Sequence, residues 1–441
     1  MSKRISLFLI FLTGLPVPIV LLSERPFSQA SVTQRASVAT SASRNAAIIA
    51  TTAAVLKDTS AIRQLRILRS VRSGAQSRVE IERMLIKNLD EQMTATEMHA
   101  TELSLRKFGL APLDFEFRPF IIRLLTEQVA GYYDPRARQF HLADWLELEG
   151  QKPVMAHELT HALQDQHFNL RRFEKWPHGD SDAELAAHAL IEGDATLAMT
   201  IYMRENPLVA LAFTRSIMSS GISSAQFNQA PRALRESLIF PYLQGLQWST
   251  QLHQRGGWSA VSKAFHKLPQ SSEQILHVEK YFAYEAPVKV MLPDLERMLG
   301  TGWRRLEYDV NGEWSYYLIL DQFLNSQPES KRAAAGWGGD RYALYEGPNH
   351  QVLLTQLTSW DTDSEAREFF DAYAKRTELR YPSATDMPAP ARSKGPLSDR
   401  RRSWRTNEGE VVMEQRGPRV LILEGIPQGI NSEALIKAIA K

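Results

Sequence analysis

Residues 155–170 read MAHELTHALQDQHFNL and carry three histidines, a glutamate and an aspartate among residues that favour a helix. His157 and His161 are four positions apart, so on an α-helix both rings project from one face about one turn from each other. Two imidazoles spaced in this way can bind one Zn²⁺ ion, and Glu158 then lies where a general base for a water molecule is needed. Pro153 lies just ahead of the expected helix start. The stretch therefore predicts a metal-binding helix with the H-E-x-x-H pattern.

This pattern is specific for its length. With 11 histidines and at most 50 glutamates in 441 residues, chance produces H-E-x-x-H roughly 0.03 times per chain. The simpler alternative, a packed or solvated helix that carries two histidines by coincidence, is therefore disfavoured.

A catalytic zinc site needs a third protein ligand and one open position. The first candidate is His167, which stands where the metzincin pattern H-E-x-x-H-x-x-G-x-x-H has its third histidine. That pattern needs a glycine to end the helix, whereas Gln164 occupies this position and favours continuation. On a continuing helix His167 points away from His161. His167 is therefore the less favoured candidate.

The second candidate lies in AELAAHALIEGDATLAMTIYM, residues 183–203, which predicts a largely buried helix. Glu184, His188, Glu192 and Thr196 recur every four residues on one face of it. A buried carboxylate must be paired or bound to a cation, which makes Glu192 a candidate third ligand. His188 is a rival ligand or an outer partner, and an ordinary cap or arginine pair is the alternative for Glu192. Asp165, one turn after His161, is either a partner of that ring or a solvated residue.

The surrounding sequence resembles a known family. GYYDPRARQFHLADW (131–145), VMAHELTHALQDQHF (154–168) and ALIEGDAT (189–196) resemble uncharacterised secreted bacterial and archaeal zinc metallopeptidases of the gluzincin type. FPYLQGLQW, GGWSAV, PQSSEQILHVEKY and AAAGWGGDRYALYEG extend the resemblance over residues 108–370. The resemblance implies His157, His161 and Glu192 as zinc ligands and Glu158 as the base, and it implies no particular substrate.

Two further residues are weaker catalytic candidates. His277 and Tyr281 are four apart in EQILHVEKY, and thermolysin-like peptidases use a histidine and a tyrosine outside the metal shell to stabilise the oxyanion. Tyr242 is another possible donor. The alternative for His277 is an ordinary hydrogen-bonded side chain where two domains meet.

The N-terminus predicts export. Lys3 and Arg4 precede an apolar run that Gly14, Pro16 and Pro18 interrupt, so residues 1–30 are expected to be a cleaved signal peptide. An uncleaved N-terminal membrane anchor is the alternative. Cysteine is absent, which excludes disulfides and thiolate ligands. A net charge of +2 shows no bias toward nucleic acid, so the expected partner is a peptide or protein substrate, with no stable membrane insertion after signal removal.

The chain divides into five expected segments. After the signal peptide come a flexible leader (31–46), a helical N-terminal region (47–107), a zincin-like catalytic domain (108–300) and a C-terminal α+β domain (301–441). The basic stretch IRQLRILRSVR, residues 62–72, is expected to be helical, with a packed face or a membrane-surface face. After about residue 300, four strands and one helix predict an antiparallel α+β arrangement. The predicted fold class is α+β: a mainly helical zincin-like core with a small edge sheet, followed by this domain.

Residues 132–143 predict two short strands about an Asp134-Pro135 turn. In zincin-like peptidases an edge strand pairs with the extended substrate backbone, and QFHLA (139–143) is the candidate for that strand. An ordinary core strand is the alternative.

The sequence thus predicts an exported zinc-dependent peptidase. The alternative is a non-catalytic exported binding or assembly protein with a structural zinc site, which a fourth protein ligand such as His188 or His167 would favour.

Overall fold

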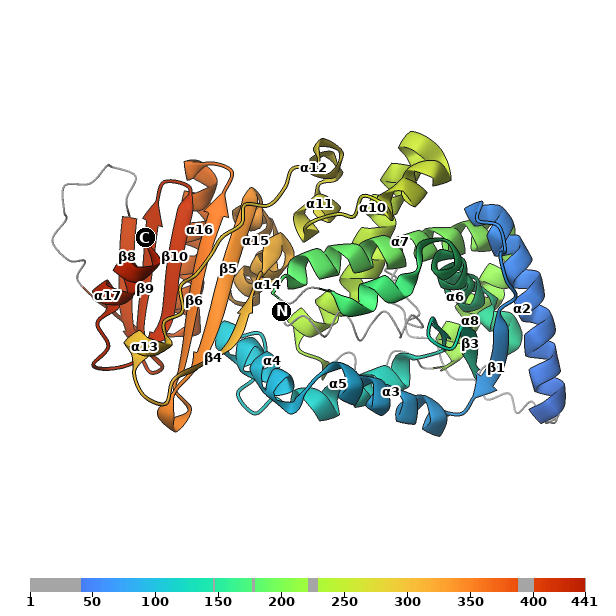
Figure 1. Cartoon of the computed structure of the whole chain (residues 1–441), viewed down its shortest axis with the longest axis horizontal. Coiled ribbons are helices and arrows are strands. Elements are labelled where there is room, and N and C mark those ends of the chain that lie inside the picture. The colour runs from blue at the N-terminus through green and yellow to red at the C-terminus, as the bar shows by residue number, and fades with distance from the viewer. Residues whose placement is uncertain (1–40, 146, 177–178, 221–228, 388–399, 441) are drawn as a thin grey trace, which may run out of the picture.

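The computed structural model describes residues 41–145, 147–176, 179–220, 229–387 and 400–440. The expected signal peptide and residues 31–40 of the expected leader lie outside this part of the chain. The protein is α+β, with a mainly helical part and a large antiparallel sheet at opposite ends of an elongated molecule (Figure 1). Among the described helices, none is both long and apolar enough to cross a bilayer.

The helical part begins with helices and short strands. In chain order these are α2 (Ser41–Arg63), β1 (Arg72–Gln76), α3 (Arg78–Gln92), α4 (Ala95–Phe108), α5 (Phe117–Gln128), β2 (Gly131–Asp134), β3 (Gln139–Ala143) and α6 (Leu148–Phe168). Capping boxes at Ser77 and Thr94 begin α3 and α4, and Gly109 ends α4 in the left-handed conformation. α3 and α4 agree with the helical character expected of this region.

Further helices of varied length follow α6. They are the 3-10 helix η1 (Leu170–Lys175), α7 (Ser181–Glu205), α8 (Pro207–Ser220), α10 (Arg232–Ala264), α11 (Ser272–Leu276), α12 (Val278–Ala283) and α13 (Glu296–Leu299). α7 is buried along most of its length, as its composition predicts. α10 bends where Gly256 and Gly257 leave helical geometry, so its second part can pack in a new direction.

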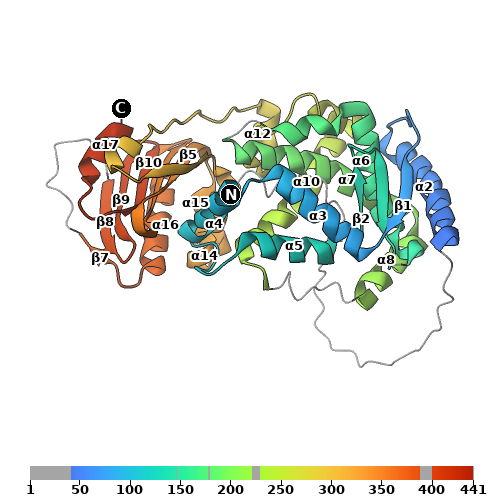
Figure 2. The ribbon, with the colours of Figure 1, turned by 60° about the horizontal axis from the view of Figure 1, so that its bottom comes forward.

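The small sheet corrects two expectations. Its strand order is β1-β3-β2, with β1 parallel and β2 antiparallel to β3 (Figure 2). QFHLA is therefore the central strand, and β1 and β2 form the edges. The expected helix over residues 62–72 is also wrong: α2 ends at Arg63, and Arg72 begins a strand. Local composition favours a helix there, but the backbone groups of Arg66, Leu68 and Arg69 bond to side chains of α6, and residues 72–76 pair with β3.

The C-terminal sheet has seven strands in the order β4-β5-β6-β10-β9-β8-β7. Their bounds are β4 (Arg304–Asp309), β5 (Trp337–Glu346), β6 (Val352–Trp360), β7 (Thr385–Asp386), β8 (Arg400–Thr406), β9 (Gly409–Arg416) and β10 (Arg419–Ile426). One face packs on α14 (Gly312–Leu324), α15 (Gln327–Ala334) and α16 (Asp363–Arg380), and the other carries α13 and α17 (Ser432–Ile439) (Figure 1). The four predicted strands are confirmed as β5, β6, β9 and β10, and the predicted helix is α16.

Strands β4, β7 and β8 add to the four predicted strands. Prolines and polar residues predict an exposed loop for residues 382–404; residues 388–399 lie outside the described chain, but Arg400–Thr406 form a strand beside β9. Three consecutive arginines hide the alternation that marks a strand, and the open edge of β9 provides the pairing.

The N-terminus of α7 joins the two ends of the molecule. Ser181 donates from its backbone N–H to Asp309 at the end of β4 (2.9 Å), and Asp182 accepts from the backbone of Ser272 (2.9 Å). Gly312 has a positive φ, and a Cβ there would overlap the Asp182 carboxylate. The C-terminal sheet thus holds one end of the helix that carries Glu192.

Candidate metal centre

Helix α6 presents the H-E-x-x-H residues as predicted. His157, Glu158 and His161 lie in the middle of the helix and are buried. The helix starts at Leu148, so Pro153 lies inside it rather than ahead of it. Pro153 has no N–H to donate to the Glu149 carbonyl, so the helix continues past one missing hydrogen bond.

Helix α7 brings Glu192 to the two histidines because it crosses α10 at unusually close range. A Cβ on Gly193 would lie 2.2 Å from the backbone of Gly245, and a Cβ on Gly245 would lie 2.1 Å from the carbonyl oxygen of Ala189. Only glycine permits this contact. The crossing seats Glu192, next to Gly193, between α6 and α10.

The three predicted ligands have the spacing of a tetrahedral zinc site. His157 Nε2 lies 3.0 Å from His161 Nε2, and Glu192 Oε2 lies 3.1 and 3.4 Å from these two nitrogens. Zinc–ligand bonds of about 2.0–2.1 Å at tetrahedral angles put two ligand atoms about 3.3 Å apart. Within the described residues, these three are the only group of three or more His, Cys, Asp and Glu side chains that could hold a metal. The donor set fits Zn²⁺ and leaves one tetrahedral position to a non-protein ligand.

The charges of the set are complementary. Burial lowers the pKa of His157. Burial also lowers that of His161, but the Glu192 carboxylate outweighs it and raises the pKa to about 9. Burial alone raises the pKa of Glu192, yet the two rings, His161 first, bring it down to about 2. Without metal, the centre therefore holds an ionised Glu192, a protonated His161 and a neutral His157.

A buried hydrogen-bond chain lies behind His161. Its Nδ1 lies 2.7 Å from Gln164 Oε1, and Gln164 Nε2 donates to the Ile191 carbonyl (3.0 Å) and to Asp194 Oδ2 (2.9 Å). From the sequence, Gln164 was considered only as a residue that continues the helix, and Asp194 was not considered. A buried aspartate two residues after a predicted ligand is itself a signal, because such a carboxylate requires a partner.

Glu158 contacts the small sheet. Its Oε2 accepts a hydrogen bond from the backbone N–H of Tyr133 on β2 (2.9 Å). Ala130 O accepts from Ala143 N on the β3 side, so by antiparallel alternation Gly131 and Tyr133 direct their backbone groups to the free edge of β2. The predicted base therefore lies against the outer edge of β2, whose first three residues are buried, and not against β3.

Tyr242 on α10 lies beside the ligands. Its ring stacks at 6.0 Å from the His157 ring. Burial raises the pKa of its hydroxyl well above the ordinary value, and the Glu192 and Glu158 carboxylates raise it further. Tyr242 therefore keeps its proton and is a hydrogen-bond donor at neutral pH.

The alternative ligands lie elsewhere. The His167 ring bonds the Arg66 carbonyl at 2.8 Å, and His188 is buried without belonging to the metal group. Asp165 pairs with Arg69 (3.0 Å) and accepts from the Tyr133 hydroxyl (3.1 Å), whereas the His161 ring turns its Nδ1 to Gln164. The hydrogen-bond partner of His161 is thus Gln164, and not the adjacent Asp165 that was considered from the sequence.

The weaker catalytic candidates bond to other partners. His277 pairs with Glu313 at 2.9 Å, and the Tyr281 hydroxyl donates to the Lys267 carbonyl at 2.8 Å. These bonds match the alternative considered for His277, a side chain bonded between α11 and α14. A catalytic role for these two stays a prediction that the geometry does not support, whereas Tyr242 lies at the centre.

The centre is closed to large molecules. His157, His161 and Glu192 are 2–4 % exposed, and Glu158 is 0 % exposed. A polypeptide can reach these atoms only if surrounding elements move.

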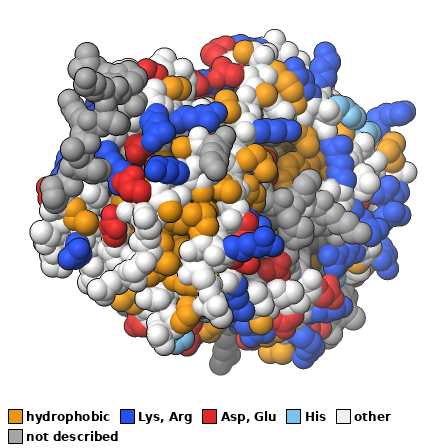
Figure 3. All heavy atoms as spheres, turned by 60° about the vertical axis from the view of Figure 1, so that its left-hand side comes forward, with side chains coloured by type: hydrophobic (Ala, Val, Ile, Leu, Met, Phe, Trp, Pro, Cys, Tyr) orange, Lys and Arg blue, Asp and Glu red, His pale blue; other side chains and the backbone are white. Residues whose placement is uncertain are grey.

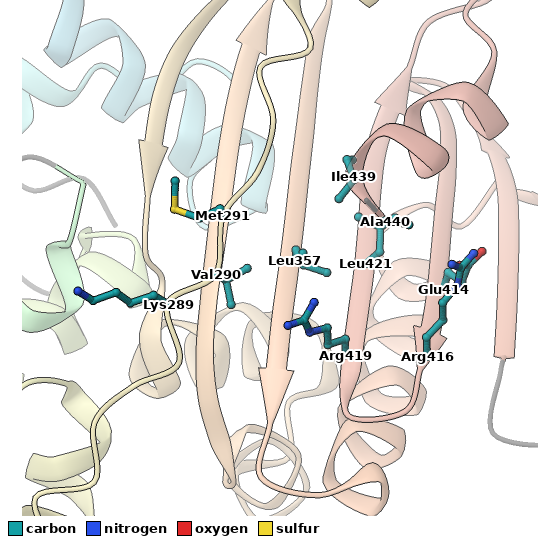
Figure 4. A pocket seen from close by; sticks show the side chains of 10 residues that line it. All are labelled: Lys289, Val290, Met291, Leu357, Glu414, Arg416, Arg419, Leu421, Ile439 and Ala440. Carbon is teal, nitrogen blue, oxygen red and sulfur yellow. The ribbon is translucent and has the colours of Figure 1, made fainter.

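A separate cavity of about 500 Å³ lies over the outer face of the large sheet, between the segment around Val290 and helix α17 (Figure 4). Leu357 and Leu421 are paired neighbours in its floor, and Arg419 lies at its rim. The space-filling view of this end shows hydrophobic side chains exposed among lysines and arginines (Figure 3). None of the predicted site residues lines this cavity.

Comparison with known families covers only the C-terminal part. A family model described as a domain of unknown function (DUF8575) matches residues 297–434. This range holds the seven-stranded sheet and excludes His157, His161 and Glu192. No curated protein and no solved structure matches the chain.

Proposed function

We propose that the protein is an exported zinc-dependent peptidase of the gluzincin type with a zincin-like helical core. The observation that carries the proposal is the spacing of three buried ligand atoms, 3.0, 3.1 and 3.4 Å apart, directly beside a glutamate. A peptide or protein is the proposed substrate.

His157, His161 and Glu192 would hold the ion, and their neutral and anionic donors are the kinds that zinc prefers. When bound, Zn²⁺ supplies Lewis acidity, which polarises a carbonyl and lowers the pKa of a water molecule to about 7. The apolar residues of α6 and α7 keep the site in low dielectric, where such polarisation is strongest.

Glu158 is the proposed general base. It follows His157 directly on α6. The hydrogen bond that its Oε2 accepts from the Tyr133 N–H stabilises the ionised carboxylate. Glu158 would accept a proton from the attacking water and pass it to the leaving amine. The Tyr242 hydroxyl, neutral and beside His157, is the proposed donor to the developing oxyanion.

The free edge of β2 is the proposed docking site for the substrate backbone. The Tyr133 N–H on this edge is bonded to Glu158, so the Tyr133 carbonyl and the backbone groups of Gly131 would pair with an extended peptide once it reaches this buried edge. Because backbone groups carry the affinity, little side-chain selectivity is expected from this edge.

One observation favours the second candidate, a non-catalytic protein with structural zinc: the near-complete burial of the centre. A structural zinc site is closed by four protein ligands. Only three residues form the metal group in the described chain, and this difference favours the peptidase.

The test is Glu158→Gln in the mature protein, with zinc content and peptide-library cleavage measured together. Glutamine can still accept from the Tyr133 N–H, so the fold and zinc content are expected to persist. Hydrolysis should fall at least about a hundredfold, since general-base catalysis contributes that much.

Glu149→Gln is the matched control, because Glu149 lies exposed on the same helix and pairs with Lys152. It should cleave like the wild type. Equal cleavage by Glu158→Gln would overturn the mechanism, and a wild type that binds zinc but cleaves nothing would support the structural role.

A further inference from the structure

Arg63, the last residue of α2, is fully buried behind the metal centre. Its Nε lies 2.5 Å from Asp194 Oδ1, and its Nη1 donates to Ser262 Oγ at 3.1 Å. The guanidinium also stacks on the Trp258 ring at 4.6 Å. An arginine from the first described helix is thus enclosed by α7 and α10.

The pair with Asp194 places Arg63 at the end of the chain that reaches His161. Asp194 Oδ1 bonds Arg63, and Oδ2 accepts from Gln164 Nε2. Gln164 Nε2 also donates to the carbonyl of Ile191, so both neighbours of this atom are acceptors. The orientation of the Gln164 amide is therefore determined, with its Oε1 directed at the His161 ring.

This orientation selects one form of His161. An amide oxygen only accepts hydrogen bonds, so His161 Nδ1, 2.7 Å away, must carry a proton. In a neutral ring, the lone pair then lies on Nε2, the atom 3.4 Å from Glu192 Oε2. That tautomer is the one that can bind a metal between these residues.

The segment after α2 holds the same part of α6 from outside. The backbone N–H groups of Leu68 and Arg69 donate to Gln166 Oε1 at 2.8 and 3.0 Å. The Arg69 side chain pairs with Asp165, and the Arg66 carbonyl bonds the His167 ring. The last turn of α6 is thus bonded to residues 66–69 through Asp165, Gln166 and His167.

We infer that Arg63 is a positioning residue of the metal centre, which acts through Asp194 and Gln164 to hold His161 in its metal-binding tautomer. The inference rests on the proposed zinc site. It makes α2 part of the centre, although α2 supplies no ligand.

A second buried pair provides a matched control. Arg376 and Glu424 are both 0 % exposed, as are Arg63 and Asp194. The hydrogen bonds of Arg376 end on Glu424 and on the Phe108 carbonyl, with no metal ligand in reach. Loss of either pair removes a buried charge contact, but only one of the two adjoins His161.

The experiment measures zinc affinity of the full chain by competition with a chromophoric chelator. Arg63→Gln should weaken zinc binding about 10–100-fold, the effect usual for outer partners of metal ligands. Arg63→Lys keeps the cation and should retain most of the affinity. Arg376→Gln should leave zinc affinity unchanged although it also breaks a buried pair.

A double variant keeps the test decisive if Arg63→Gln fails to fold. Arg63→Met/Asp194→Leu replaces both charges with apolar groups, which proteins often tolerate, and it removes one of the two acceptors that orient Gln164. Reduced zinc affinity in the folded double variant supports the inference.

Wild-type affinity in folded Arg63→Gln, or in the folded double variant, would overturn the positioning role alone. A wild-type protein that binds no zinc would overturn the proposed function and this inference together, so the two failures are distinguishable.

Discussion

The molecule contains two buried arginine–carboxylate pairs that differ in what surrounds them. Arg63–Asp194 lies among α2, α7 and α10, and the chain continues through Gln164 to a predicted zinc ligand. Arg376–Glu424 lies between α16 and β10, where Glu424 also accepts from the Tyr373 hydroxyl. Both pairs are fully buried, so burial and charge alone do not distinguish a functional site from a structural one.

The difference lies in which groups the pairs orient. The C-terminal pair bonds α16 to the end of α4 through the Phe108 carbonyl, and it therefore joins two parts of the fold. The N-terminal pair bonds to Gln164, the side chain beside the proposed metal ligand His161. The same interaction contributes to stability in one place and is expected to contribute to metal affinity in the other.

The largest expected effect is a loss of folding stability without a loss of zinc binding. Glu424→Gln leaves the Arg376 cation buried without its counter-ion, which should lower the free energy of unfolding by about 3–5 kcal/mol. Although burial raises it, Arg376 holds the pKa of Glu424 below its ordinary value, so the native pair is ionised. Denaturant unfolding measures the loss. Weakened zinc binding by the folded variant would contradict the separation.

A smaller effect is expected at the helix crossing that seats Glu192. Alanine is favoured over glycine in a helix by roughly 1 kcal/mol, but a Cβ on Gly193 would lie 2.2 Å from the Gly245 backbone. The clash should prevail, with a net loss of about 1–3 kcal/mol in unfolding free energy and weaker zinc binding. Gly74→Ala on β1 is the control, since its nearest neighbour is a side-chain atom 3.8 Å away. Higher stability of Gly193→Ala would show that the helices can separate freely.

The smallest expected effect is the pH dependence of zinc binding. The metal-free pKa of His161 is raised to about 9, and bound zinc requires the unprotonated ring. Below pH 9 zinc must therefore displace one proton, so affinity should rise about tenfold per pH unit between pH 6 and 8. Chelator competition at several pH values measures the slope. A flat profile would show that no proton leaves the centre, and Glu424→Gln should leave the slope unchanged.

Local patterns made part of the centre predictable. His157, Glu158 and His161 form a motif within one helix, where spacing alone determines which side chains share a face. Glu192 was named because an acid in an apolar helix needs a cation and because gluzincin peptidases take their third ligand from the helix that follows H-E-x-x-H. The strands β5, β6, β9 and β10 have clear hydrophobic patterns, and these were sufficient to predict the antiparallel α+β arrangement.

Long-range partners were not predictable from the same information. Residues 72–76, RSGAQ, have no strand pattern and are extended because β3 pairs with them. Arg63 belongs to a stretch rich in arginines and looks like a surface residue until α7 and α10 enclose it. QFHLA has the expected strand geometry, but its central place depends on β1, which lies more than 60 residues earlier.

The link between Arg63 and Asp194 also affects the order in which the chain can complete its fold. The two residues are 131 positions apart in sequence, so α2 leaves the ribosome long before its carboxylate partner exists. Contacts between distant residues form late because closing a long loop costs entropy. A centre that depends on this contact is incomplete in every nascent chain, and maturation of the metal site must follow synthesis of α7.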